Sequence, residues 1–381
     1  MKIRVGVIGI GSQGRGIVQV IQRNEDMNVI AIADRNQYKL ENVARFLNKG
    51  SLLTTKPINV ISVKPDVLVD ATGNIIEAAF FIRNALERKI NVVTMNAEVD
   101  QIFGRLFRKI AEANGVIYSS DAGDQHGVLA RVIRETSSMG FETVIAGNNK
   151  GFLYRYANPE SIKEEAAKRR ISVRMCTNFT DGTKLAIEMA LVANAFGLDI
   201  LQTGMSGPRV ENVDEALNAL QLERARELNG VVDYVLGAKP GGSVFVIGYS
   251  DDPEDRFYMN YYKMGEGPYY LFLRPYHVCH YETPLTVRRI MKNKEAILVQ
   301  KKRVLEVGAR AKIDLEPGTI LDGIGGYHLY GILEKPSSLP IGLATGTVLI
   351  NRKKRDEPIE WDDVEFPKDD SRLVLWEEQD K

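Results

Sequence analysis

Short apolar runs alternate with amphipathic segments over the first third of the chain. The apolar runs are nearly continuous, as in IRVGVIG, NVIAIAD, DVLVDAT, NVVTMN and GVIYSS. Between them, apolar residues recur at helical spacing over residues 15–23, 38–47, 77–88 and 102–114. Apolar strands that alternate with amphipathic helices are typical of a parallel sheet covered on both faces. The pattern therefore predicts a doubly wound α/β domain over residues 1–125.

The regular alternation ends near residue 126. Strand-like runs such as FETVIAGNNKG, GSVFVIG and YYLFLRPY then mix with helical patterns at residues 159–169 and 184–196. We expect an α+β domain over residues 126–302 that supplies the substrate side of a cleft. Short strands with Pro-Gly and Gly-Gly turns follow, which predicts a small β-rich domain over residues 303–381, ending in a poorly ordered polar tail.

The charge balance and the cysteine content argue against several classes of partner and site. Fifty Lys and Arg residues balance fifty Asp and Glu residues, so the net charge gives no argument for nucleic acid or an anionic membrane. Cys176 and Cys279 are too few for a disulfide framework or a thiolate metal site. The first apolar run is too short for a signal peptide or a membrane span. We expect a cytoplasmic protein whose partner is a small molecule.

A Gly-x-Gly-x-x-Gly motif at residues 9–14 ends the first predicted strand and opens the first predicted helix. In this context the glycines let the backbone approach a pyrophosphate, and the free N–H groups at the helix start bind it. The sequence therefore predicts a Rossmann domain that binds NAD or NADP. The loop residues expected to contact the cofactor are Gly9, Gly11, Ser12, Gln13 and Gly14.

The end of the second predicted strand bears on the choice of cofactor. Asp34 lies twenty residues beyond Gly14, where a carboxylate binds the ribose 2′-hydroxyl and repels a 2′-phosphate, which favours NAD. Arg35 follows and would pair with a 2′-phosphate if Asp34 turned away, so NADP stays open. Thr72, Gly73 and Asn96 follow later strands and are expected to line the same cofactor site.

Several charged residues are candidates for chemistry. Glu98 and Asp124 follow predicted strands and are expected to rim the cleft, whereas Asp100 and Asp121 are equally well explained as cap or turn residues. Lys150 and Lys184 lie beside polar or glycine residues, where a desolvated lysine can donate a proton to a developing alkoxide. Asp181 lies three residues before Lys184, either as a helix cap or as part of the site.

Two arginine segments suggest an anionic substrate. Arg209 follows Gly-Pro, and Arg274 precedes Pro-Tyr-His. Arginine binds phosphate or carboxylate in a bidentate manner, although each arginine alone is equally compatible with a structural ion pair. His277 is the best histidine candidate for acid–base work, and no pair of histidines has the spacing of metal ligands.

With these segments in view, the run VVTMNAEVD followed by LFRKIAEANGVIY resembles homoserine dehydrogenase, as does DGTKLAIEMALVANAFGL. Ala97 is a departure, because homoserine dehydrogenases usually carry a lysine directly after the residue that corresponds to Asn96. The segments GVIYSSDAGDQ, GMSGPR, GVVDYVLG and GEGPYYLFLRPYHVCHYETPLTVRRIM are more similar to homoserine dehydrogenase-like oxidoreductases with a C-terminal SAF domain. That group includes the DXR-like (type II) 1-deoxy-D-xylulose 5-phosphate reductoisomerases.

The resemblance extends to the C-terminal region, where EPGTIL and RDEPIEWDDV resemble the SAF fold, a small β-rich module. It implies a homo-oligomeric oxidoreductase. A reductoisomerase reaction would add a divalent metal that chelates vicinal oxygens, with Glu98 and Asp124 as the ligands we would name.

Together these features predict an NAD(P)-dependent oxidoreductase. It is expected to reduce a carbonyl, or oxidise the matching alcohol, on a small molecule that carries a phosphate or carboxylate group. Three alternatives stay open: a sugar-phosphate reductoisomerase, an amino-acid dehydrogenase of the aspartate type, and a non-catalytic NAD(P)-binding sensor or scaffold.

Overall fold

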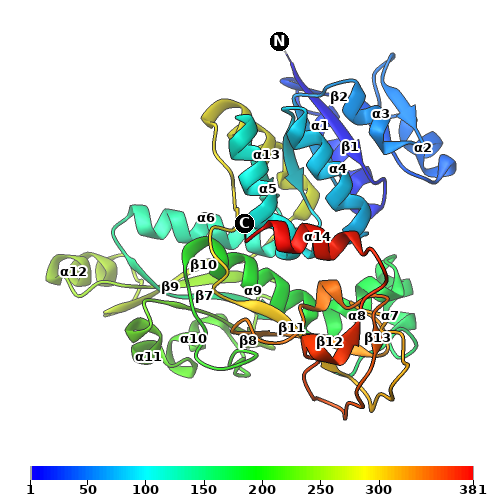
Figure 1. Ribbon diagram of the computed structural model, residues 1–381. Coiled ribbons are helices and arrows are strands. Elements are labelled where there is room, and N and C mark those ends of the chain that lie inside the picture. Colours follow the sequence, from blue (N-terminus) through cyan, green and yellow to red (C-terminus); the bar gives the residue numbers. More distant parts are fainter. Residues whose placement is uncertain (1, 381) are drawn as a thin grey trace. The chain divides into compact units, whose positions relative to one another are not determined.

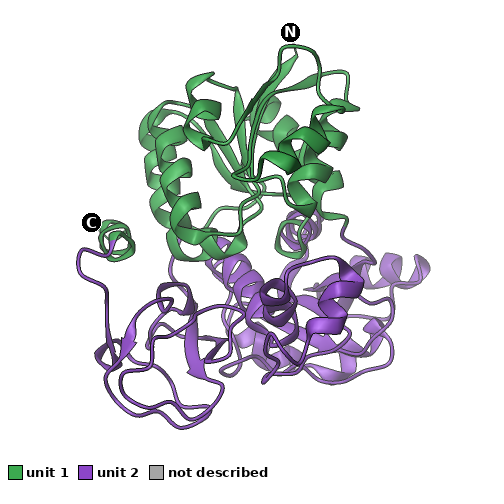
Figure 2. Cartoon of the chain, turned by 90° about the vertical axis from the view of Figure 1, so that its right-hand side faces the viewer, with its two compact units in different colours: residues 1–127, 278–300, 371–381 green, residues 128–277, 301–370 purple. Residues whose placement is uncertain are grey.

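The computed structural model describes residues 2–380, and the chain divides into two compact units (Figure 1; Figure 2). The first unit holds the described residues up to 127, residues 278–300 and those from 371 onward. The second unit holds residues 128–277 and 301–370. Two later segments thus return to the first unit. The three consecutive domains expected from the sequence are a different partition, and that division stays a prediction.

A six-stranded parallel sheet with the order β3-β2-β1-β4-β5-β6 forms the first unit. The strand order reverses between β1 and β4, and sheets of this kind bind ligands beyond the carboxyl ends of the strands at that point. The predicted doubly wound Rossmann fold is confirmed. The strands are β1 (Ile3–Ile8), β2 (Met27–Ala33), β3 (Leu52–Thr54), β4 (Val67–Asp70), β5 (Asn91–Thr94) and β6 (Tyr118–Ser120).

Helices cover both faces of this sheet. On one face α3 contacts α4 and α4 contacts α5, while α13 from the returning segment contacts α1. Val287 and Ile290 of that segment join the core around β1 and α1. The helices are α1 (Ser12–Gln22), α2 (Gln37–Ala44), α3 (Pro57–Ser62), α4 (Ile75–Glu87), α5 (Ala97–Asn114), the short η2 (Cys279–Glu282), α13 (Thr283–Arg288) and the π-helix η3 (Arg289–Asn293).

The C-terminal tail differs from the sequence prediction. Instead of a poorly ordered end, the chain forms α14 (Ser371–Glu378), which packs against α5. Trp376 is buried, and the Lys109 ammonium donates to the Gln379 carbonyl oxygen at 2.6 Å. Arg83 and Glu378 form an ion pair at 2.7 Å. A few apolar side chains in a polar stretch, together with ion pairs to earlier helices, are enough to hold the tail.

The second unit is built on a mixed four-stranded sheet with the order β10-β9-β7-β8. Its strands are β7 (Glu142–Lys150), β8 (Val231–Leu236), β9 (Val244–Tyr249) and β10 (Tyr269–Arg274). The helices are α6 (Gln125–Ser138), which begins at the end of the first unit, α7 (Lys163–Arg169), α8 (Val173–Thr180), α9 (Thr183–Phe196), η1 (Val213–Glu215), α10 (Ala216–Ala219), α11 (Leu222–Glu227) and α12 (Pro253–Tyr261). No helix within residues 2–380 is long and apolar enough to cross a membrane.

Helix α9 is the centre of the second unit. Residues 183–195 are all buried, as expected for a helix that is apolar on nearly every side. It contacts β8 on the sheet side and the hairpin of β11 and β12 on the other. The C-terminal elements are β11 (Glu306–Ala311), β12 (Leu329–Glu334), η4 (Ile341–Leu343), β13 (Val348–Leu349), η5 (Trp361–Asp363) and β14 (Val364–Glu365). The region is short-stranded as predicted, and its likeness to the SAF fold stays a prediction.

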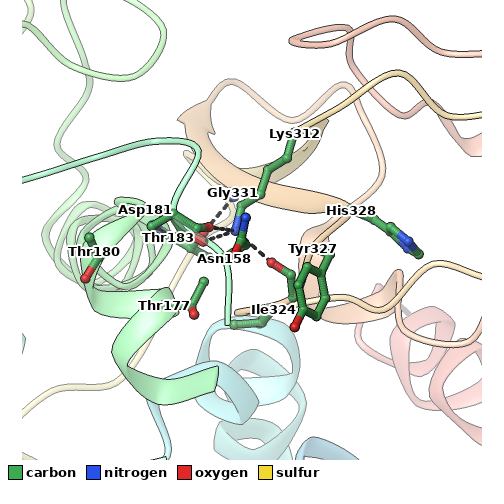
Figure 3. Close-up of polar contacts among 12 residues, drawn as sticks. Asn158, Thr177, Thr180, Asp181, Thr183, Lys312, Ile324, Tyr327, His328 and Gly331 are labelled. Atoms are coloured by element: carbon green, nitrogen blue, oxygen red, sulfur yellow. Dashed lines mark hydrogen bonds and ion pairs between the residues drawn. The ribbon is translucent and has the colours of Figure 1, made fainter. Parts of the chain in front are cut away.

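A buried lysine ties these C-terminal strands to the start of α9 (Figure 3). The Lys312 ammonium donates to the carbonyl oxygens of Ala157 at 2.6 Å and Gly326 at 2.9 Å, and lies 2.8 Å from Asp181 Oδ2. The ammonium thus has two carbonyl acceptors and one carboxylate as its ion-pair partner. Burial raises the pKa of Asp181, and the positive charge of Lys312 opposes that increase. Asp181 also accepts from the Thr183 N–H at 2.9 Å, so the turn before α9 is fixed from both sides.

Replacing this lysine tests its contribution to stability. We expect Lys312→Met to lower the free energy of unfolding by about 3–5 kcal/mol, because Asp181 is left as a buried charge without its partner. Urea unfolding of the two proteins measures the difference. Lys335→Met is the matched control: Lys335 also pairs with a carboxylate, Asp199 at 2.6 Å, but its side chain is 59% exposed, so a loss of less than about 1 kcal/mol is expected. Equal losses of unfolding free energy in the two variants would contradict the stabilising role given to the buried pair of Lys312 and Asp181.

Candidate functional site

The glycine loop leaves an open cradle of backbone at the start of α1. Gly9 has a φ of 92°, and a Cβ at Gly14 would stand 1.8 Å from the Gly9 carbonyl oxygen. No described side chain caps the first turn of α1, and that turn holds no acidic residue. A Cβ at Gly11 would meet no protein atom within 4 Å. The unpaired N–H groups and the helix dipole therefore face open space, an arrangement that suits a phosphate group.

Asp34 is held in place beside this loop. Its Oδ2 accepts from the Ile10 N–H at 2.7 Å, and its Oδ1 accepts from the Asn36 N–H at 2.8 Å. Lys39 lies 3.7 Å from the same carboxylate, whose side chain is only 9% exposed. Arg35 differs, because its side chain is 81% exposed and its nearest acidic partner, Glu77, lies 3.8 Å away. The carboxylate is thus fixed, while the guanidinium is in solvent.

Polar residues at the ends of β4 and β5 form a second part of the same edge. Asp70 is buried and accepts from the Thr72 N–H at 3.0 Å, the Thr72 hydroxyl at 2.7 Å and the Thr94 hydroxyl at 2.9 Å. Burial raises the pKa of Asp70 to about 6, and these hydrogen bonds oppose that increase. Asn96 caps α5 by accepting from the Val99 N–H at 3.1 Å. Its buried Nδ2 donates to no atom of the described chain, so a donor is left for a ligand.

Asp121, at the end of β6, is bound by the returning segment. It accepts from the Thr286 hydroxyl at 2.7 Å, the Thr283 hydroxyl at 3.1 Å and the Gly123 N–H at 3.3 Å. Burial raises the pKa of Asp121 to about 6, and these hydrogen bonds oppose that increase. Asp100 also has structural partners, because it accepts from the hydroxyls of Tyr118 and Ser120. Both aspartates therefore hold the first unit together.

The other sequence candidates of the first unit lie at helix starts. Glu98 lies in the first turn of α5. Asp124 Oδ1 accepts from the Gln125 N–H at 2.9 Å, and its Oδ2 lies 3.9 Å from His126 Nδ1. Gln13, expected in the cofactor loop, directs its side-chain oxygen to His280 Nδ1 at 2.8 Å. That contact leaves the backbone N–H of Gln13, rather than its side chain, for a phosphate.

In the second unit, three polar residues form a buried cluster at the end of β7. The Lys150 ammonium lies 3.0 Å from Glu188 Oε2, and the Asn148 amide donates to the same oxygen at 3.1 Å. Glu188 lies on α9 one turn after Lys184, so the two side chains leave the helix on the same side. Glu188 is 2% exposed and Lys184 is 6% exposed. This arrangement places a lysine ammonium, fixed by a carboxylate, at the end of a strand.

The sheet register places each of the two arginines two strands from this cluster, on opposite sides of it. Arg274 is opposite Val244, which is opposite Asn148, so Arg274 and Asn148 share a sheet face two strands apart, about 10 Å. Arg274 also lies over the ring of Tyr276, 4.5 Å from its centroid. Arg209 pairs with Leu236, which is opposite Lys150, so Arg209 and Lys150 also share a sheet face two strands apart, about 10 Å. The two arginines therefore lie at opposite edges of the sheet, with the cluster between them.

His277 follows β10, and its Nδ1 is 2.8 Å from the Gly242 carbonyl oxygen. This contact fixes the ring and leaves Nε2 for another partner. Glu188 and Asn148 were missed by the sequence argument, although the spacing of Lys184 and Glu188 on a predicted helix was a usable signal. The alternation of side chains along the predicted strand would likewise have placed Asn148 on the same face as Lys150.

Comparison with known families covers both units. Residues 9–119 match the NAD-binding domain of homoserine dehydrogenase, and residues 123–283 match the catalytic domain of oxidoreductase DRL. The homoserine dehydrogenase of Bacillus subtilis (strain 168) is 25% identical over 210 residues, which cover 50% of this chain and 48% of the relative. The chain thus spans about half the length of that curated relative.

Two solved structures are similar to this chain. A homoserine dehydrogenase from Thiobacillus denitrificans is similar with a TM-score of 0.51 and 16% identity, over 94% of this chain and 98% of that chain, and at this identity the likeness shows the fold alone. A hyperthermophilic archaeal homoserine dehydrogenase in complex with NADPH has a TM-score of 0.47 and 15% identity, over 76% of this chain and 97% of that chain.

Asp121 gives a pH-dependent prediction. Its folded pKa of about 6 lies above the ordinary 3.8, so the folded state binds the proton more tightly than the unfolded state. The group contributes most to stability below about pH 4, and the contribution is lost as the pH rises through 6. Asp121→Asn imitates the protonated form, so we expect this variant to exceed the native chain by up to about 3 kcal/mol near pH 7 and to match it near pH 4.

Urea unfolding at several pH values measures this difference. Asp214→Asn is the control, because Asp214 is exposed, and it should leave the pH profile of stability unchanged. A constant difference between Asp121→Asn and the native chain from about pH 4 to about pH 7 would show that Asp121 does not titrate as argued.

Proposed function

Since residues 9–119 match the NAD-binding domain of homoserine dehydrogenase and residues 123–283 match the catalytic domain of oxidoreductase DRL, we propose that the chain transfers a hydride between a nicotinamide dinucleotide and a small anionic hydroxy or keto substrate. The observation that carries the proposal is the open cradle at residues 9–14, where α1 presents N–H groups without a protein partner. The unpartnered Asn96 amide at the same sheet edge adds a donor for the cofactor. The nicotinamide, when bound, gives or accepts the hydride.

The cofactor is proposed to be NAD rather than NADP. Two backbone N–H groups fix the Asp34 carboxylate, which therefore does not turn away to admit a 2′-phosphate. Its remaining lone pairs accept from the ribose hydroxyls. Arg35 extends into solvent and would be the first residue to contact a 2′-phosphate if NADP were used. Thr72 and Gly73 are proposed to contact the cofactor beyond β4.

Lys150 is proposed as the proton donor. In the reductive direction the hydride adds to the carbonyl carbon, and an ammonium donates a proton to the oxygen as the alkoxide forms. The Glu188 carboxylate holds the Lys150 ammonium in place. Lys184, one turn before Glu188, supplies a second positive charge that stabilises the developing oxyanion. Glu98 and Asp124 are proposed to orient substrate hydroxyls.

Arg274 and His277 are proposed to bind the anionic end of the substrate. Arg274 shares the sheet face of Asn148, and a guanidinium binds carboxylate or phosphate in a bidentate manner. Arg209 shares the sheet face of Lys150 on the other side of the cluster and is proposed as a second group for the anionic end. Hydride transfer by these groups needs no metal. A rearrangement of a sugar phosphate would add a divalent cation on Glu98 and Asp124, and full activity in EDTA would remove that cation from the proposal.

A homo-oligomer is also proposed. No residue of α12 is buried, and the helix carries the exposed aromatic residues Phe257, Tyr258 and Tyr261. The edge strand β10 next to β9 exposes Leu273 as well. Exposed apolar side chains beside an unpaired strand edge are typical of a surface that another subunit covers. Light scattering on the purified chain tests this proposal.

Substitution at Gly11 tests cofactor binding without disturbing the fold. Gly11→Ala adds a methyl group that meets no protein atom but would lie against a bound pyrophosphate. We expect its affinity for NADH to fall at least about tenfold with unchanged thermal stability, and native affinity for NADPH to be lower than for NADH. Calorimetric titration measures the affinities for NADH and NADPH.

Gly241→Ala is the control, because a Cβ at Gly241 also meets no protein atom within 4 Å. If Gly11→Ala bound NADH as tightly as the native chain does, the proposed phosphate site at residues 9–14 would be contradicted.

A turnover assay distinguishes an enzyme from a non-catalytic NAD(P)-binding sensor. The native chain is incubated with NADH or NAD and a panel of sugar phosphates, hydroxy and keto acids, homoserine and aspartate, and absorbance of the reduced cofactor is followed. We expect activity on a phosphate or carboxylate substrate, and a loss of about 10²–10⁴-fold in kcat for Lys150→Met with NADH binding retained. Glu188→Gln should lower kcat less than Lys150→Met does, because the lysine is still present but loses the carboxylate that holds it in place.

The outcomes distinguish the alternatives. Activity on homoserine or aspartate alone would replace the reaction class proposed here with amino-acid dehydrogenation. NADH binding without turnover of any panel member would favour a sensor or scaffold. Unchanged kcat in Lys150→Met would exclude that lysine as the proton donor and direct the test to Lys184.

A further inference from the structure

A cavity of about 310 Å³ lies within the second unit, between the start of α9, the end of β8 and strand β12. Its walls are mostly apolar and include Leu185 of α9, Leu236 of β8 and Ile332 of β12. Ligand pockets in proteins begin at about this size and share this mixture of apolar walls and a few polar groups. At about 30 Å³ for each non-hydrogen atom, the cavity accommodates roughly ten such atoms.

Two tyrosine rings form a fixed wall of the cavity. The hydroxyls of Tyr156 and Tyr330 both donate to Asp356, at 2.8 Å and 2.9 Å, and the rings meet edge to face at 6.5 Å. The turn at Asp181 on the opposite edge is held by Lys312 (Figure 3). Both sides of the cavity are therefore set by hydrogen bonds that do not involve a ligand, so the cavity is pre-formed.

A guanidinium lies at this wall without a carboxylate partner. Arg155 stacks over the Tyr330 ring at 5.3 Å from its centroid, and no ion pair to it occurs within residues 2–380. Burial raises the pKa of Tyr234 and of Tyr330, and the positive charge of Arg155 opposes that increase at both residues. Arg155 and Tyr234 both line the cavity. The two groups offer N–H and O–H donors to one anionic group.

The cavity is separate from the cluster of Lys150 and Glu188. Successive residues of an α-helix point about 100° apart, so Leu185 and Ala186 leave α9 in directions different from Lys184 and Glu188. Neither the cluster residues Asn148, Lys150 and Glu188 nor Lys184 line the cavity. The cavity is bounded instead by the C-terminal strand β12, which the proposed hydride transfer does not use.

We propose that this cavity binds a small organic carboxylate with an apolar body, whose carboxylate group is held by the Arg155 guanidinium and the Tyr234 hydroxyl. The apolar body lies between Leu185, Leu236 and Ile332. A single guanidinium with one hydroxyl suits a monoanion, and the apolar walls favour a branched or aromatic carboxylate over a hydrated inorganic anion.

Calorimetric titration of the full chain with phenylacetate, which has ten non-hydrogen atoms, tests the proposal without cofactor or turnover. We expect binding to the native chain, a loss of affinity of about tenfold in Arg155→Gln and a smaller loss in Tyr234→Phe. Arg23→Gln, which removes an exposed arginine of the first unit, should bind as the native chain does. Glu188→Gln should also retain binding, because its side chain belongs to the separate cluster.

Three results would overturn the proposal. The first is no phenylacetate or isovalerate binding at millimolar concentration, and the second is equal affinity in Arg155→Gln. The third is inorganic phosphate binding as tightly as phenylacetate, which would mean a simple anion site without a role for the apolar walls. Thermal unfolding of each variant shows that it is folded. Because NADH binding is measured separately, failure here leaves the proposed hydride transfer untouched.

Discussion

The backbone of the first glycine loop approaches itself so closely that residue 14 has no room for a side chain. The Gly9 carbonyl oxygen occupies the space beside it, at 1.8 Å from where a Cβ would stand. This contact brings the start of α1 directly under β1, with its N–H groups toward the carboxyl ends of the strands. Asp34 extends the constraint by holding the Ile10 N–H. The proposed anion site at this point consists of backbone alone, so any side chain that displaced the loop would remove it.

A second set of close approaches makes residues 278–300 part of the same unit. A Cβ at Gly123 would stand 1.8 Å from the Cys279 carbonyl oxygen, and one at Gly16 would stand 2.4 Å from the ring of His280. Thr283 and Thr286 then bind the buried carboxylate of Asp121. The returning segment is therefore packed against glycines that serve no turn of their own. Because this segment packs back onto the first unit, the unit boundaries do not follow the alternation of strands and helices along the chain.

Local patterns predicted the fold and the cofactor loop, because strand periodicity and the glycine spacing are properties of neighbouring residues. The three-residue strand β3 was missed since it is too short to show a period, and α14 was missed since its apolar residues lie in a polar stretch. Lys312 gave no sequence signal, because its partner Asp181 is far away along the chain. The separation of Arg209 from Arg274 likewise follows from the strand order, which periodicity does not determine.

Helix α9 carries two buried polar residues, Asn194 and Glu188, whose partners differ in kind. Asn194 is satisfied by backbone: it accepts from the N–H groups of Val304 and Leu305 and donates to the Leu305 carbonyl oxygen. Backbone N–H and carbonyl groups are fixed in position, so Asn194 serves only to hold α9 against this segment. Glu188 instead pairs with the ammonium of Lys150, whose side chain is 18% exposed and ends a flexible stem at the edge of a strand. A partner of that kind can exchange one hydrogen bond for another during a reaction, whereas a backbone N–H cannot. The free-energy cost of burying the Glu188 carboxylate is therefore offset by the Lys150 ammonium, whose hydrogen bonds can still rearrange.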